Sequence, residues 1–203
     1  MTNPARGLGV SELARLTQMT PEEIKLLLDA RLPEYGNFTV ADFFLNRDSR
    51  GNFPGYAALF VEIARQLADD NGLPLLAALK FVSYTGAIKH FASHDGHHSH
   101  PTRRADTDLW VGVLGIRSNW GGSPRDGWPV TGFGPRECWM LGHYDGTFDQ
   151  VTAAVKSRMV RDTVDVDGID LADHARLFMT NVSAADRRLR KRAKELGIAL
   201  DTE

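Results

Sequence analysis

Apolar residues recur every three or four positions along much of the chain, which is the spacing of one face of an α-helix. Short helices are predicted within residues 1–45. Two longer helices are predicted across residues 54–93, and the second of these is apolar on most sides. Three further helices are expected near the C-terminus, at 148–160, 171–181 and 184–196.

Capping residues indicate where several of these helices begin and end. Ser11 stands near the start of the first helix, while Asp170 and Ser183 precede the last two. Gly197 follows the final helix and can take the left-handed conformation that ends many helices. These residues set the expected boundaries of the helical segments.

One segment departs from the helical pattern. Residues 109–116 form a β-prone apolar run, and residues 137–141 can pair beside it. All four tryptophans of the chain fall in this part of the sequence: Trp110, Trp120, Trp128 and Trp139. We therefore predict a mainly helical α+β fold. A helix-turn-helix-like head over residues 1–45 precedes a body over 46–203, which holds a small sheet at about 109–144.

Composition narrows the class of protein without identifying its function. Hydrophobic residues make up 42% of the 203 residues and charged residues 25%, as in an average soluble globular protein. The longest uninterrupted apolar stretch is too short to span a bilayer, and the first residues lack the apolar stretch of a secretory signal. Cys138 is the only cysteine, so no internal disulfide can form. We expect a cytoplasmic protein with no membrane partner.

The most specific motif is a pair of short helices near the N-terminus. Thr20 is expected to be an N-cap, with a proline at the first helical position and Glu23 three residues after the cap. Ala14 lies where the two helices would cross closely, and Ile24 and Leu27 would hold the second helix onto the first. Residues 32–43 then fit a shortened wing that leads into another helix.

In this order, residues 10–43 resemble the winged helix-turn-helix of the MerR and excisionase type. The resemblance implies that the second helix enters the major groove and that the wing touches the DNA backbone. Thr20, Lys25 and Arg31 are then candidate nucleic-acid contacts. The sequence departs from the family in three respects. Gln18 stands where the turn usually has glycine, and the wing lacks the family's phosphate-binding arginines. The second helix also carries more acidic than basic side chains, with Glu22, Glu23 and Asp29 against Lys25 and Arg31.

The C-terminal helix carries most of the positive charge available for phosphate. Residues 1–40 hold four basic and five acidic residues, whereas residues 187–194 hold six basic residues. The candidate contacts on this helix are Arg187, Arg188, Arg190, Lys191, Arg192 and Lys194. Arg188 and Arg192 are four residues apart and are expected to reach the same stretch of DNA backbone. The alternative is an ordinary solvated helix face.

A histidine cluster offers a different chemistry. Five of the seven histidines lie within residues 90–100. If the helix continues through them, His90, His94 and His98 lie on one face and can bind zinc or another transition metal. The other interpretation, a polar loop that begins near Ser93 and holds no cofactor, is favoured by Gly96 and Pro101.

Three functions remain open at this point. The first is a DNA-binding protein that regulates transcription, with a body that forms a homodimer or another oligomer, or senses a ligand. The second is a metal- or ligand-binding enzyme with its site in the His- and Trp-rich middle segment. The third is a phage-type small terminase subunit, or another accessory protein of DNA packaging or recombination.

Overall fold

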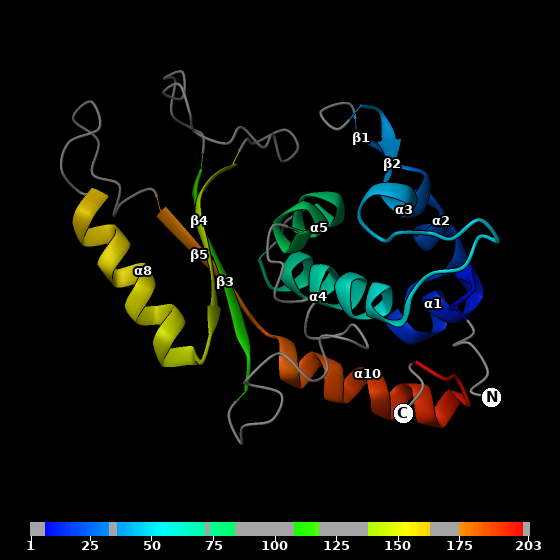
Figure 1. The fold of residues 1–203 in the computed structure, drawn as a ribbon. Helices are drawn as coiled ribbons and strands as arrows, with labels where there is room; N and C mark the ends of the chain where they lie inside the picture. Colours follow the sequence, from blue (N-terminus) through cyan, green and yellow to red (C-terminus); the bar gives the residue numbers. More distant parts are fainter. Residues whose placement is uncertain are drawn as a thin grey trace.

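A computed structural model describes residues 7–32, 36–71, 74–83, 108–117, 138–162 and 175–200 (Figure 1). The fold is α+β and mainly helical, as the sequence predicts. The helices are α1 (Val10–Thr17), α2 (Pro21–Asp29), α3 (Val40–Phe43), α4 (Gly55–Asn71), α5 (Leu75–Ser83), α8 (Phe148–Asp162) and α10 (Val182–Leu196). The strands are β1 (Arg31–Leu32), β2 (Phe38–Thr39), β3 (Trp110–Arg117), β4 (Cys138–Gly146) and β5 (Ala175–Asn181).

The larger sheet has the order β4-β3-β5, and both pairings are antiparallel. Helix α8 packs on β3 and β4 on one face, while α4 contacts β5 from the other side (Figure 1). Gly112 of β3 allows the close approach of α8, since a Cβ atom there would lie 2.7 Å from Cγ1 of Val151. The sheet predicted at 109–144 is confirmed through strands β3 and β4.

Strand β5 replaces the helix that was expected at 171–181, so that prediction is wrong over residues 175–181. Phe178 and Thr180 are buried, whereas Leu177 is exposed and Met179 is partly exposed, which is the alternation of a strand. The strand forms an antiparallel pair with β3, and in the register of this pair Phe178 lies opposite Val113. A short apolar run fits a helix or a strand equally well, and here the pairing with a distant strand decides.

Helix α10 follows β5 directly. Its N-cap is Asn181, whose side chain accepts a hydrogen bond from the Ala184 amide at 2.8 Å, so the expectation of Ser183 as the cap is wrong. Ser183 lies inside the helix, and its hydroxyl accepts a hydrogen bond from the Leu109 amide at 2.8 Å. Gly197 ends the helix in the left-handed conformation, as predicted. Asp170 lies outside the described residues.

The hydrophobic core is continuous from the N-terminal helices to the sheet. Helix α4 lies at its centre, contacting α1, α5, α10 and β5. Buried Leu16 and Ile24 of the N-terminal helices belong to the same cluster as Phe60 of α4, Val113 of β3 and Leu189 of α10. The residues on either side of position 45 therefore share one packed interior.

Helices α4 and α5 account for the described part of the helical segment predicted at 54–93. Within the described ranges, no helix combines the length and the apolar character that a bilayer-spanning segment needs.

Candidate nucleic-acid interface

Helices α1 and α2 pack together and are joined by a short turn at Gln18. This residue ends α1 with φ 56° and ψ 32°, the left-handed conformation for which glycine is usually chosen. The amide of Met19 donates to the carbonyl of Ala14 at 3.1 Å and closes the turn. Helix α1 begins at Val10 with Gly9 as its N-cap, so Ser11 lies inside the helix and does not cap it.

Thr20 caps α2 as predicted. The Glu23 amide donates to the Thr20 hydroxyl at 3.2 Å, and the Thr20 amide donates to the Glu23 carboxylate at 2.8 Å. The backbone hydrogen bond from Thr20, followed by the bond from its hydroxyl, lowers the pKa of Glu23 below its usual range. One of the acidic groups of α2 is therefore engaged with the start of its own helix.

The outward face of α2 is mixed in chemistry. Ile24 and Leu27 are buried against the rest of the fold, as predicted, and Leu28 is buried with them. Lys25 is exposed, and beside it Leu26 keeps 76% of its surface in contact with solvent. Glu22 and Asp29 are exposed as well, so this face offers two carboxylates, one positive charge and one large apolar side chain.

A small two-stranded antiparallel pair follows α2. Strands β1 and β2 are antiparallel, with Arg31 opposite Thr39. The Arg31 guanidinium donates to the carbonyl of Asn37 at 3.2 Å and remains exposed. Phe38 is also exposed and stacks on Phe43 of α3, with ring centroids 6.2 Å apart. Among its described residues, this hairpin, where the resemblance predicts a wing, carries one arginine and an exposed aromatic ring.

Three basic side chains of α10 face solvent: Arg188, Lys191 and Lys194. They form no ion pair with any residue that the structure describes. We call them the free basic face of α10. Two other arginines of this helix are already paired, since Arg190 contacts Asp186 at 2.9 Å and Arg187 contacts Asp108 at 2.6 Å.

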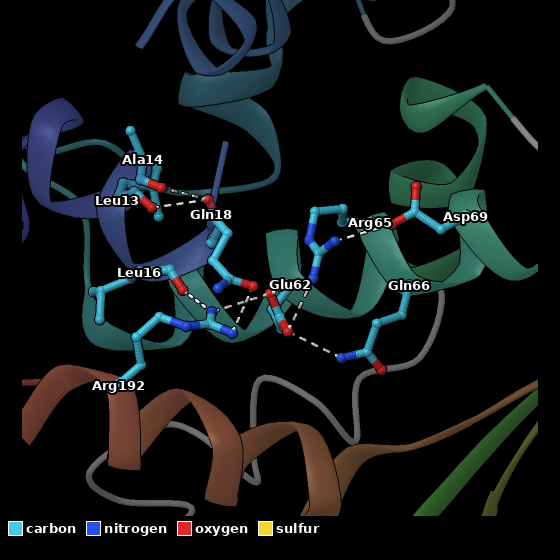
Figure 2. Close-up of polar contacts among 10 residues, drawn as sticks. Leu13, Ala14, Leu16, Gln18, Glu62, Arg65, Gln66, Asp69 and Arg192 are labelled. Atoms are coloured by element: carbon cyan, nitrogen blue, oxygen red, sulfur yellow. Dashed lines mark hydrogen bonds and ion pairs between the residues drawn. The ribbon is translucent and has the colours of Figure 1, made fainter. Parts of the chain in front are cut away.

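The Arg192 side chain extends from α10 toward α1 and α4 (Figure 2). Its guanidinium donates to the Leu16 carbonyl in the last turn of α1 and, at 3.0 Å, to the Gln18 side chain. Only 17% of its side chain is exposed. Arg192 therefore caps the negative end of α1 and does not share a surface with Arg188, although the two are four residues apart.

Glu62 of α4 is the buried carboxylate of the same cluster and was not anticipated from the sequence (Figure 2). Its side chain is 1% exposed and accepts a hydrogen bond from Gln66 at 3.0 Å. Arg65 and Arg192 lie 3.4 and 3.6 Å from its oxygens. The signal in the sequence was an acidic residue within an apolar helical run, since such a charge needs a partner when it is buried.

A second ion pair connects α10 to the start of β3. Asp108 accepts two hydrogen bonds from Arg187, at 2.6 and 3.0 Å, and a third from Asn181 at 2.7 Å. The Arg187 hydrogen bonds and then that of Asn181 lower the pKa of Asp108 to about 2. Arg187 thus has a structural partner, and the sequence offered no sign that Asp108 would lie near it.

His90, His94 and His98 lie outside the described residues, so the structure places none of them. Across the ranges that are described, no three His, Cys, Asp or Glu side chains gather in a group that could hold a metal ion.

The described geometry thus brings α10 beside the α1–α2 turn. Of the predicted contacts, Thr20, Lys25 and Arg31 lie on or next to α2, and Arg192 joins the turn itself. In comparisons with known proteins, no family model, no curated protein and no solved structure matches this chain.

Proposed function

We propose that the protein binds double-stranded DNA and regulates transcription, with α2 in the major groove and α10 supplying phosphate contacts. The observation that carries this proposal is the attachment of a basic helix to a helix-turn-helix through Arg192, which donates to both Leu16 and Gln18. A wing follows α2 in the order that a winged helix-turn-helix requires.

The distribution of charge between α2 and α10 supports the proposal that both helices contact DNA. The outward face of α2 is too acidic to bind phosphates by itself, because Glu22 and Asp29 oppose Lys25. The free basic face of α10 adds three positive charges that no described carboxylate neutralises. Phosphate contacts provide most of the sequence-independent affinity for DNA, and base contacts provide the specificity. In this proposal, α10 supplies the affinity and α2 the specificity.

A homodimer on a palindromic site completes the proposal. Two copies related by a two-fold axis double the number of phosphate contacts and match the symmetry of such a site. This matters here because a single copy presents few unpaired basic side chains near α2.

The test is a mobility-shift assay with a duplex of random sequence over a range of salt concentrations. The wild type should bind at low salt and release the duplex as salt rises. Exchange of Arg188 and Lys191 for glutamine should weaken binding to all sequences and reduce the salt slope by about two. The matched control is Lys156→Gln, on the exposed side of α8 across the sheet, which should bind as the wild type does.

Two results would refute the proposal. One is the absence of any retarded complex at low salt. The other is a double variant, Arg188→Gln with Lys191→Gln, whose affinity and salt slope equal those of the Lys156→Gln control.

A further inference from the structure

Gln18 holds a backbone conformation that its residue type does not favour. Three non-glycine residues in the described part of the chain have positive φ: Gln18, Asn37 and Asn46. Asparagine adopts the left-handed region readily, because its short side chain can bond to the local backbone. The longer glutamine side chain lacks this local support. A residue of this kind stays left-handed only where the surrounding structure holds it there.

The guanidinium of Arg192 is the group that holds Gln18. One of its nitrogens donates to Oε1 of Gln18 at 3.0 Å, and another donates to the carbonyl of Leu16 (Figure 2). These two acceptors stand on either side of the point where α1 ends. Because the guanidinium is planar and its donors have a fixed geometry, it fixes the Gln18 side chain relative to the last turn of α1.

Arg192 is itself fixed from the side of α4. Its guanidinium lies 3.6 Å from a carboxylate oxygen of Glu62, whose side chain is 1% exposed. A buried carboxylate must keep its charged partners, because their loss leaves an uncompensated charge in the interior. Arg65 and Gln66 also contact this carboxylate, and both belong to α4. The position of Arg192 is therefore set by a cluster that does not include the turn.

We propose that Arg192 and Gln18 form an interlock through which α10 determines the conformation of the α1–α2 turn. The left-handed conformation of Gln18 is stabilised by a guanidinium 174 positions away in the sequence, and the turn opens more often when that group is lost. Glutamine serves at this position because its side chain reaches Arg192. Glycine would fit the backbone better but would lose the contact. The interlock is a property of the folded chain and goes beyond the proposed function, since it holds whether or not the protein binds DNA.

A double-mutant cycle on the full chain, measured by urea denaturation, tests the interlock. In an Arg192→Met background, Gln18→Gly removes the backbone cost and loses no contact, so it should raise the folding equilibrium constant. In the wild type the same substitution also breaks the 3.0 Å hydrogen bond. Its effect there should be less favourable by about fivefold. The same effect of Gln18→Gly in both backgrounds would overturn the proposal.

Asn37→Gly is the matched control. Asn37 also has positive φ, in the hairpin that follows α2, and no described hydrogen bond or ion pair joins it to Arg192. Its replacement by glycine should have the same effect in both backgrounds. If Arg192→Met does not fold, the cycle is run in the double variant Arg192→Met, Glu62→Gln, from which the buried charge has been removed.

Amide hydrogen exchange gives a second measurement, at the turn itself. The Met19 amide donates to the Ala14 carbonyl at 3.1 Å and reports opening of the turn. Arg192→Met should accelerate exchange at Met19 about tenfold more than at the amides of β3. Gly112→Ala, which disturbs the contact between β3 and α8, should show no such excess at Met19. Equal acceleration at Met19 and in β3 on loss of Arg192 would mean that the arginine supports the whole fold and that no interlock exists.

Discussion

Arg192 of α10 and Glu62 of α4 form an ion pair at 3.6 Å whose carboxylate is almost completely buried. The same guanidinium donates to the Leu16 carbonyl of α1. One arginine therefore joins three helices that are far apart in the sequence. It also explains why a positively charged residue on a basic helix is directed into the protein and away from solvent.

We expect Arg192→Met to lower the free energy of unfolding by about 2 kcal/mol, because it leaves the Glu62 carboxylate with fewer partners in the interior. Urea denaturation measures this change. Adding Glu62→Gln to the same chain should recover about 1 kcal/mol, because the buried charge is then removed. Strictly additive losses in the double variant would show that the two side chains are not coupled.

The Asp108–Arg187 pair should make stability depend on pH in acid. The folded-state pKa of Asp108 is about 2, below its unfolded value of about 3.9, so ionised Asp108 stabilises the fold. This contribution is fully present above about pH 5 and is lost as the pH falls toward 2. The Asp108 side chain is 34% exposed, so solvent screening limits the contribution to about 1 kcal/mol.

The measurement for this pair is the difference in unfolding free energy between the wild type and Asp108→Asn from pH 6 to about pH 2. The difference should be constant in the upper part of this range and shrink below about pH 4. A difference that does not change with pH would contradict the ionic origin of the effect.

Gly112→Ala should destabilise the sheet by about 1–2 kcal/mol, because the new methyl group would lie 2.7 Å from Cγ1 of Val151. Thermal unfolding would report the loss. In a chain that already carries Val151→Ala, the added cost of Gly112→Ala should be much smaller, because the clashing methyl group is gone. An equal cost in both backgrounds would indicate strain in the β3 backbone and not the approach of α8.

Lys25→Gln should change which duplexes are preferred more than it changes affinity for a random duplex, because a base contact carries sequence information. The measurement is selection from a random pool, followed by sequencing. Arg188→Gln is the comparison, since loss of a phosphate contact should weaken binding while leaving the selected sequences the same. Identical enriched sequences from both variants would exclude a reading role for Lys25.

The features that were predicted correctly from the sequence are those that depend on residues close together in the chain. The Thr20–Glu23 capping box is such a feature, because both hydrogen bonds join residues three positions apart. Gly197 at the end of α10 is another. The fold class followed from apolar periodicity in the same way, since period is a local property of the chain.

Features that depend on distant partners could not be predicted. The spacing of Arg188 and Arg192 placed both on one solvent face, but the Leu16 carbonyl and buried Glu62 attract only the second. Residues 175–181 fit a helix until β3 is present to pair with them. In both cases the deciding interaction joins residues that are more than 50 positions apart, and no local pattern contains it.

The direct passage from β5 into α10 has a mechanical consequence. Asn181 ends the strand and caps the helix, so no flexible linker separates the sheet from a helix about 22 Å long. Near the far end of this helix, the Arg192 guanidinium donates a hydrogen bond to Gln18, which lies at the turn between α1 and α2. One continuous strand and helix therefore tie the position of Gln18 to the larger sheet, over a distance that no single side chain could bridge.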